Sequence, residues 1–446
     1  MDTYKGFVEI NDTQYPFVFS NFLLVISTGR DDVSWEYISS IVIDGKIRLF
    51  DNRKAELILF ADRYQRVHLG EYGIHVTGFI LCYSFEDNAE VAHFSTIRNM
   101  MFKHPAIDYF FRSDALLLDR YIELLNLQKS PIYPGIELPS RDIPYREGCK
   151  FTIEQKEIVV EFGATSRFEY EKPFPFTLFN IIYLKCEEGM NIDEAFKAIN
   201  IIKLFLCLIS QANAINLDCV LLNLNTSYPS HDAMLYLRPE EERPILKNRV
   251  LDYENIKSGI ENIFSQIIAN QICFRSLFDT SITQIHIHDI VNICAAFEAQ
   301  FELTNPKFKD KEQRAVKRKM INDLNALRKN YSDVELEHFD TVLEGFKNFS
   351  DTLKLRLQTA LGEFVRICGK TGASGGFKKD YQQMPERIKN ARNAIAHGNL
   401  EHPLIEAAFT DTELVRAIIY MLILQEAKID DWNIGACLKK LSGFPM

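Results

Sequence analysis

The spacing of the apolar residues changes once along this chain of 446 residues, and no other feature constrains the fold as much. In the first half, apolar residues alternate with polar ones or form short runs, which is typical of β-strands. From about residue 252 they recur every three or four positions, as on amphipathic helices. The sequence therefore predicts an α+β protein, with a β-rich N-terminal domain ahead of an all-α bundle.

The first half contains a strong hairpin signal at Asp44-Gly45, because this pair tolerates the positive φ angles of a two-residue turn. The turn lies between the short runs 41–43 and 46–50. Further strands are expected at 55–60, 75–85, 151–162, 176–186 and 217–224. Together they predict a mostly antiparallel sheet, sandwich or open barrel. Residues 191–210 have the length and period of one buried helix, and the proline-rich stretch 130–147 is expected to be a surface loop.

The second half reads as helices joined by short connections. Ser332-x-x-Glu335 is a candidate capping box, and residues 351–368 carry one apolar stripe. Residues 381–397 are expected to form a helix that ends at Gly398, and Thr410-x-x-Glu413 is expected to open the next helix.

We divide the chain into a β-rich N-terminal domain at 1–227, a linker and connecting helix at 228–280, and a helical bundle at 281–446. The net charge of −10 is unevenly spread. The bundle has 23 basic and 22 acidic residues, whereas the rest has 28 basic and 39 acidic. This difference supports the boundary and leaves an anionic substrate open to the bundle.

The nine cysteines are scattered and form no C-x-x-C pair, which favours reduced thiols without a zinc cluster or a disulfide framework. We find no signal peptide, and the longest apolar run, 201–209, is too short to span a membrane. A cytoplasmic location is therefore expected, with no membrane partner, no cofactor and no metal.

The most informative motif is Arg392-Asn393 followed by His397 and Gly398. It joins a permanent cation, an amide and a side chain that titrates near neutral pH, which suits phosphoryl-transfer chemistry. On a helix Asn393 and His397 are about 40° apart, whereas Arg392 and His397 are about 140° apart. Only the long arginine side chain or a distorted helix end could bring those two together, and Gly398 favours such an end.

Spacing alone is weak support for a site. Arg63 and His68 have the same separation, and Arg98-Asn99 precedes His104 at a slightly longer one. Both pairs lie in the β-rich half. Only the motif at 392–397 combines the asparagine, a helical bundle and a glycine at the helix end.

With its Arg-Asn-x-x-x-His motif inside an all-α bundle, the region 281–446 resembles the HEPN superfamily. A β-rich region ahead of such a bundle is similar to ApeA-like anti-phage proteins. The resemblance implies a dimer that brings two motifs together as a metal-independent RNA endonuclease. His397 would then be the general base or acid, Arg392 would hold the scissile phosphate, and Asn393 would orient the histidine or contact the phosphate.

By the same resemblance the protein would be a toxic effector of abortive infection, with RNA as substrate and a phage-derived or protein trigger acting on the N-terminal half. Two alternatives stay open. The bundle could be a non-catalytic interaction scaffold, or it could be the target of a partner nucleotidyltransferase. The simplest structural interpretation is that Arg392 and His397 only cap a helix end, where the helix dipole favours their charge.

A second candidate region is basic. It holds seven cations that could follow an RNA backbone or simply form a solvated face, namely Lys307, Lys309, Lys311, Arg314, Lys317, Arg318 and Lys319. Two weaker signals are set aside. Gly369-Lys370-Thr371 lacks the earlier glycine of a phosphate-binding loop, and His286-x-His288 lacks a third metal ligand.

Overall fold

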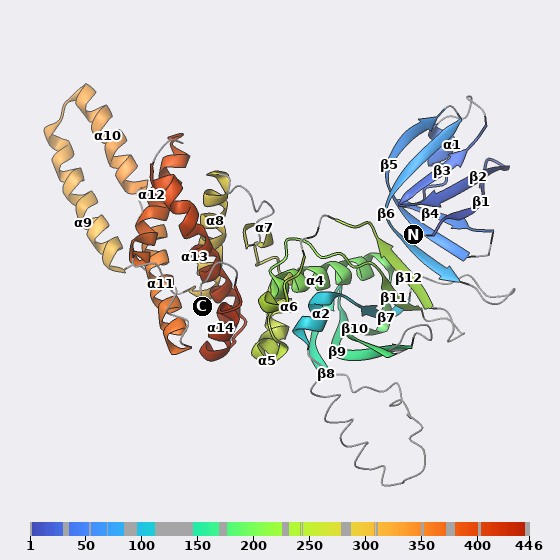
Figure 1. Ribbon diagram of the computed structural model, residues 1–446. Helices are drawn as coiled ribbons and strands as arrows, with labels where there is room; N and C mark the ends of the chain where they lie inside the picture. The colour runs from blue at the N-terminus through green and yellow to red at the C-terminus, as the bar shows by residue number, and fades with distance from the viewer. Residues whose placement is uncertain are drawn as a thin grey trace, which may run out of the picture. The chain divides into compact units, whose positions relative to one another are not determined.

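The computed structural model describes the residues given at the end of this paragraph, for some of them the main chain alone. It divides into two compact units, Met1–Ile268 and Ala269–Met446, which we treat separately (Figure 1). The described residues are 2–29, 35–52, 55–68, 70–83, 96–111, 146–168, 176–224, 232–240, 242, 244–277, 287–306, 308, 311–348, 352–371, 380–399 and 403–441.

The N-terminal unit is built on one antiparallel sheet of twelve strands, so the β-rich domain predicted from the alternating pattern is confirmed. The strands are β1 (Tyr4–Ile10), β2 (Thr13–Ser20), β3 (Leu23–Ser27), β4 (Lys46–Phe50), β5 (Ala55–His68), β6 (Glu71–Tyr83), β7 (Ile97–Phe102), β8 (Arg146–Ile153), β9 (Lys156–Phe168), β10 (Phe176–Met190), β11 (Val220–Leu224) and β12 (Asp232–Leu237). Their order is β1-β2-β3-β6-β12-β11-β7-β10-β9-β8, with β5 also paired to β6, and β4 to β5.

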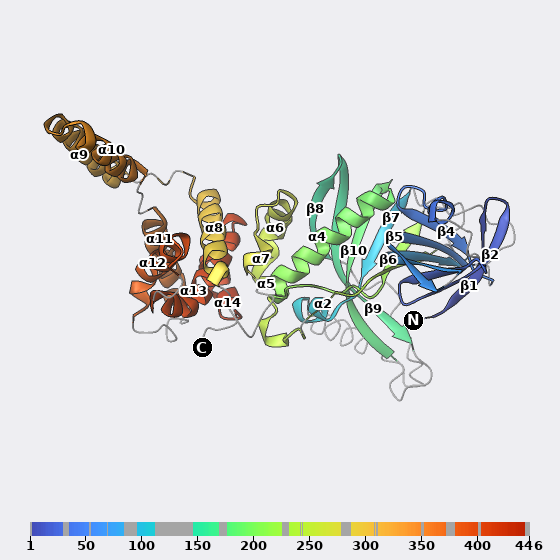
Figure 2. The same cartoon turned by 90° about the horizontal axis from the view of Figure 1, so that it is seen from above.

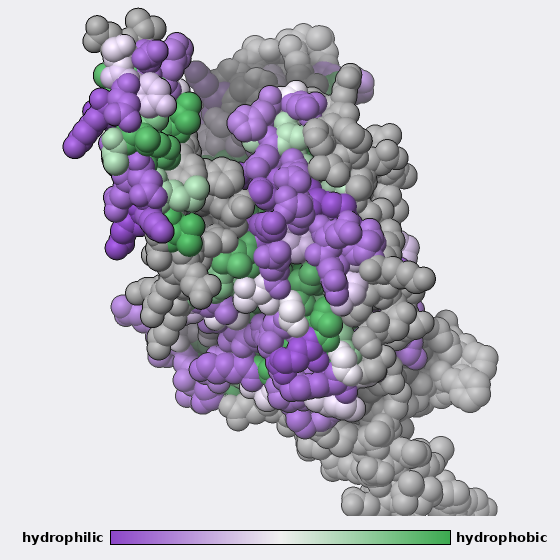
Figure 3. Space-filling view, turned by 90° about the vertical axis from the view of Figure 1, so that its left-hand side faces the viewer, coloured by the Kyte–Doolittle hydropathy of each residue, from purple (hydrophilic) through white to green (hydrophobic). Residues whose placement is uncertain are grey.

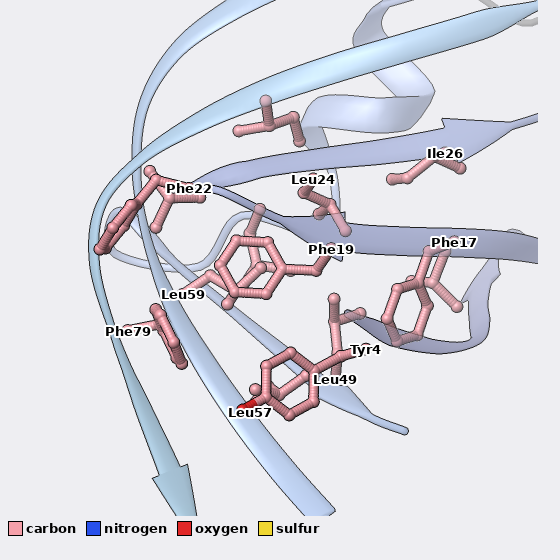
Figure 4. Close-up of a cluster of buried hydrophobic side chains, with 14 of the residues drawn as sticks. Tyr4, Phe17, Phe19, Phe22, Leu24, Ile26, Leu49, Leu57, Leu59 and Phe79 are labelled. Atoms are coloured by element: carbon pink, nitrogen blue, oxygen red, sulfur yellow. The ribbon is translucent and has the colours of Figure 1, made fainter. Parts of the chain in front are cut away.

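Six of these strands curl around one apolar core. They run β1-β2-β3-β6-β5-β4, and the two end strands meet at the bridge between Gly6 and Asp51, so that a barrel is closed at that point. Tyr4, Phe19 and Phe79 lie at its centre, with the rings of Phe19 and Phe79 edge to face at 4.9 Å (Figure 4). The alternation along β1, buried at even and exposed at odd positions, places this core on one face of the strands.

The rest of the unit covers the continuing sheet with helices (Figure 2). Helix α4 (Ile192–Ser210) is the predicted buried helix, and it begins with a capping box between Asn191 and Glu194. Phe205 of α4 stacks on Phe264 at 4.7 Å. The shorter helices in the described part of the unit include α1 (Trp35–Ser39), α2 (Pro105–Phe110), α5 (Tyr253–Ile256) and α6 (Ile260–Ile268).

The C-terminal unit is all-α in the parts that the structure describes, as the helical period predicts. Its helices are α7 (Phe274–Leu277), α8 (Ile287–Thr304), α9 (Lys311–Leu327), α10 (Asp333–Asn348), α11 (Thr352–Lys370), α12 (Met384–Ala396), α13 (Pro403–Glu426) and α14 (Asp431–Leu438). Helices α8 and α11–α14 pack together as a bundle. Helices α9 and α10, which lie between α8 and α11 in the sequence, pack against each other as a helical hairpin.

Several local expectations can be compared with the structure. The Asp44-Gly45 turn is confirmed, with φ of 51° and 73°, although Ile43 forms only a single bridge to Lys46 before it. The run 151–162 is two strands, because Glu154 and Gln155 adopt positive φ in a tight turn. Residues 228–280, expected as linker and connecting helix, contain β12, α5, α6 and α7.

The expected helix start at Thr410 is wrong, because α13 already begins at Pro403. Proline is favoured in the first turn, where its missing N–H costs no hydrogen bond, and Leu404 to Phe409 continue the helix. The expected loop at 130–147 falls almost wholly outside the described residues. None of the described helices combines the length and apolar character that crossing a membrane requires.

The closed end of the barrel depends on the absence of a side chain at Gly6. A Cβ there would lie 2.5 Å from the carbonyl oxygen of Phe50 and 2.8 Å from the ring of Phe17. We expect Gly6→Ala to destabilise the N-terminal unit by about 1–3 kcal/mol, since backbone and core must both shift. Hydrogen exchange of β1 and β4 measures the effect. Gly362→Ala, whose Cβ meets nothing within 4 Å, is the control. Equal exchange in β1 and β4 of both variants would contradict the close approach.

Candidate active site

The motif residues lie at the C-terminal end of α12, and an apolar stripe holds this helix in the bundle. Met384, Ile388 and Ala391 are fully buried and share one face of the helix. They pack against α8, α11 and α13. Arg392 and Asn393 follow directly after the last residue of the stripe, so the packing of α12 fixes where their side chains start.

A charged clamp adds to this stripe. The Arg387 guanidinium binds Asp411 of α13 in bidentate fashion, with Nε to Oδ2 at 2.6 Å and Nη2 to Oδ1 at 2.8 Å. Asp411 is only 6% exposed, and Nη1 of Arg387 also reaches Asp380 at 2.8 Å. The hydrogen bonds to Asp411 raise the pKa of Arg387. A planar bidentate pair tolerates little rotation, so it sets the orientation of α12 about its axis.

A second clamp ties α12 to α11. Lys354 lies 2.5 Å from Glu386, which also accepts a hydrogen bond of 3.2 Å from the amide of Asn390. The hydrogen bond from Lys354 lowers the pKa of Glu386. Neither clamp is predicted from the sequence above. The sequence feature that could have indicated them is the charged pair Glu386-Arg387, which stands directly before the buried Ile388.

Helix α12 ends in a Schellman motif. His397 is its C-cap, and Gly398 follows with φ of 75°. The Gly398 N–H donates to the carbonyl of Ile395 at 3.0 Å, and the Asn399 N–H donates to that of Ala394 at 2.9 Å. The predicted helix end at Gly398 is therefore confirmed. The left-handed turn removes the chain from the helix axis just after His397.

The three motif side chains lie at the surface of this helix end. Arg392 and His397 are exposed and Asn393 is partly buried. The Arg392 Nη1 donates to Oδ1 of Asn393 at 3.4 Å, so the structure brings these two side chains together. His397 makes no side-chain hydrogen bond or ion pair with the residues that the structure describes. A guanidinium and an imidazole thus face solvent within two turns of one another.

The neighbouring helix α8 also faces Arg392. Burial and, to a smaller extent, the charge of Glu298 raise the pKa of Cys294 to about 12 against the opposing charge of Arg392. Glu298 and Glu302 themselves lie 3.8 Å and 2.7 Å from the guanidinium of Arg356 on α11. Both carboxylates thus form ion pairs with α11.

The two motifs of similar spacing have other settings. Arg63 and His68 lie on β5, and Arg63 contacts Asp62 at 3.4 Å. His104 caps α2, with Nδ1 accepting from the Ala106 N–H and Nε2 at 3.1 Å from Glu242. Burial lowers the pKa of His104 despite the nearby Glu242 carboxylate. Both ring nitrogens of His104 are already engaged, which distinguishes it from His397.

The basic region lies on and before α9. Arg318 and Lys319 are exposed, whereas Lys307 and Lys309 fall outside the described residues. Lys311, Arg314 and Lys317 lie on α9, and for them only the main chain is described. The hairpin α9–α10 also exposes apolar side chains, among them Val316, Met320 and Val342, as patches among hydrophilic ones (Figure 3).

The weaker candidates have structural roles where they are described. Lys370 ends α11 and lies 2.6 Å from Asp431, and the buried Thr371 hydroxyl donates to the carbonyls of Cys368 and Ile367. His288 lies in the first turn of α8, and His286 falls outside the described residues. In the parts of the chain that are described, no three His, Cys, Asp or Glu side chains gather as a metal site would require.

In a comparison with known protein families, residues 291–431 match the one described as Apea-like HEPN, and this range contains most of α8, all of α9 to α13 and the motif at 392–397. The β-rich antiparallel unit before it fits the ApeA-type arrangement. No curated protein and no solved structure matches the chain.

The contribution of the Arg387 clamp to the stability of the C-terminal unit can be measured. We expect Arg387→Ala to destabilise the C-terminal unit by about 3–5 kcal/mol, because it leaves the buried Asp411 carboxylate without its cation. Arg392→Ala, at an exposed position on the same helix, is expected to change stability by no more than about 0.5 kcal/mol. Chemical denaturation of both variants measures the difference. Equal stabilities would show that the clamp does not hold α12.

Proposed function

We propose that the C-terminal unit is the nuclease of an effector protein and that it cleaves RNA at Arg392, Asn393 and His397. The Apea-like HEPN match supports a nuclease-type effector. The observation that carries the assignment is the exposure of Arg392 and His397 at one helix end. The scaffold alternative, in which the motif only stabilises the core, predicts that both side chains are buried.

In the proposed reaction the ribose 2′-hydroxyl is the nucleophile. His397 takes its proton as the 2′ oxygen bonds to phosphorus, and the bond from phosphorus to the 5′ oxygen breaks. The leaving oxygen takes a proton, giving a 2′,3′-cyclic phosphate and a 5′-hydroxyl. Arg392 holds the non-bridging oxygens, whose negative charge grows in the transition state. No metal ion is needed, because the nucleophile belongs to the substrate.

The proposed reaction uses the motifs of two copies of the chain. One histidine cannot be neutral to accept a proton and protonated to donate one in the same step. The motif of a partner subunit would supply the second role, as in the dimers common in this family. Asn393 would hold Arg392 in place through the contact between their side chains. We further propose that the activity is toxic, serves anti-phage defence and is controlled by the N-terminal unit.

The nuclease assignment is tested with purified full-length protein and mixed cellular RNA in the presence of a chelator. We expect His397→Ala to lower the cleavage rate by about 10²–10⁴-fold, the usual contribution of general acid–base catalysis. His338→Ala, which removes an exposed histidine on α10, is the control and should cleave as the wild type does. Equal cleavage by the wild type and His397→Ala would refute the assignment. Adenylylation of the wild type by a co-expressed neighbouring enzyme would favour the nucleotidyltransferase alternative.

The basic region makes a separate prediction about binding. If Arg318 and Lys319 contact the RNA backbone, the double change R318E and K319E should weaken binding of single-stranded RNA. It should also reduce the slope of log K against log salt by about 1.4, because each phosphate that a cation neutralises contributes about 0.7 to the slope. Fluorescence anisotropy with His397→Ala as background avoids cleavage. Lys428→Glu, an exposed charge beyond α13, is the control. An unchanged salt slope would show that Arg318 and Lys319 belong to a solvated face and do not contact the RNA backbone.

A further inference from the structure

An apolar cavity opens on the surface of the N-terminal unit, between the two end strands of the barrel. Its volume is about 690 Å³, and it is lined by residues 7–10 of β1 and by Lys46 and residues 48–50 of β4. Phe7, Ile43 and Phe50 are exposed there by 59%, 71% and 51%. Three large apolar side chains around one opening are unusual on a soluble surface and indicate a binding site.

The cavity exists because the barrel does not close along its whole length. Strands β1 and β4 meet at Gly6 and Asp51, where the Asn52 N–H donates to the carbonyl of Lys5 at 2.8 Å. Beyond this bridge no further pair joins residues 7–10 to residues 46–50 among the described pairings. Each strand keeps its other neighbour, β2 or β5, so each presents one edge to the gap.

The strand registers show which main-chain groups face the gap. Ile10 and Thr13 flank the two-residue turn at Asn11 and Asp12, so their main-chain groups hydrogen-bond to each other. Every second residue of β1 hydrogen-bonds to β2 in the same way. Val8 and Gly6 therefore bond to β2, whereas the N–H and C=O of Glu9 point into the gap. The bond accepted by Lys5 confirms that the odd-numbered residues of β1 face this side.

The register of β4 with β5 likewise shows which main-chain groups of β4 face the gap. The Asp51 N–H donates to Ala55, and the Ala61 N–H donates to Gly45, so the odd-numbered residues bond to β5. The main-chain groups of Arg48 accordingly face the gap from the other side. Two strand edges thus present donors and acceptors across one apolar cavity, an arrangement that an added strand would satisfy.

We propose that this gap binds an extended polypeptide segment of a partner protein, which adds as a strand between β1 and β4. Alternate side chains of the segment would point inward, to Val8, Ile10 and Leu49, or outward, to Phe7, Ile43 and Phe50. Both sets are apolar, so the segment is apolar along its length. The two cations on the outer side are already paired, Arg48 with Glu56 at 2.5 Å and Lys46 with Asp193 at 3.5 Å, so the segment needs no acidic residue to balance them.

The facing edges select this occupant. A lipid-like or other small apolar ligand would fill the cavity but leave the main-chain groups of Glu9 and Arg48 without hydrogen bonds. A segment in extended conformation satisfies both edges at once. Binding of such a segment does not depend on RNA cleavage. It gives the N-terminal unit a binding chemistry, which under the proposed function would be that of the trigger.

The experiment selects ligands for full-length His397→Ala from a phage-displayed library of random dodecapeptides. The best peptide is then synthesised and its Kd measured by fluorescence anisotropy. We expect the selected sequences to be apolar along their length. Glu9→Pro should raise the Kd at least about tenfold, because proline lacks the N–H that faces the gap. Glu9→Ala keeps that N–H and should bind as the parent does.

Side-chain variants complete the test. The double change F7S and F50S should also raise the Kd roughly tenfold or more. The double change V18S and Y64S, at exposed apolar positions outside the lining, should not. Hydrogen exchange of β2 and β5 checks that each variant remains folded. The proposal is overturned if no peptide is enriched, if Glu9→Pro binds as Glu9→Ala does, or if the site is instead occupied by a second copy in a concentration-dependent dimer.

Discussion

The bidentate pair between Arg387 and Asp411 is the interaction on which the candidate site most depends. The buried stripe of α12 holds the helix in the bundle, but apolar packing tolerates small rotations about the helix axis. A planar guanidinium facing a carboxylate does not. Because Arg392 and His397 lie five and ten residues beyond Arg387, a rotation of α12 would carry both away from the phosphate that the proposed function places between them. The clamp therefore acts on the geometry of the motif without touching it.

The ends of α12 explain why its last turn can carry chemistry. A helix C-terminus presents carbonyl groups and a partial negative charge, which favours cations nearby. The Schellman motif at Gly398 satisfies the last carbonyls with main-chain N–H groups, so the Arg392 and His397 side chains are not needed for capping. Both remain exposed. Main-chain N–H groups therefore do the capping here, while the partial negative charge of the helix end still favours the two cations electrostatically.

The sequence predicted the parts of this protein that local chemistry decides. The two periods of the apolar residues gave the α+β class, Asp44-Gly45 gave its turn, and Gly398 gave the end of α12. What it could not give depends on contacts between distant residues. Arg387 and Asp411 are 24 positions apart and look like ordinary surface charges. Likewise, nothing local shows that β1 and β4 meet at Gly6 and then separate. The early start of α13 was missed because Thr410-x-x-Glu413 imitates a capping box inside a longer helix.

The two proposals set a limit on how strongly a trigger could control the nuclease. A peptide that binds only one state shifts the balance between states by at most its own binding free energy. At a hundredfold excess over its Kd, this is about 2.7 kcal/mol, or about a hundredfold change in the ratio of states. To make half of the molecules active, one segment therefore requires a resting state that already populates the active form at about 1% or more. An effector held more tightly than that would need a second contact from the same partner, because adding one strand to the barrel could not release it.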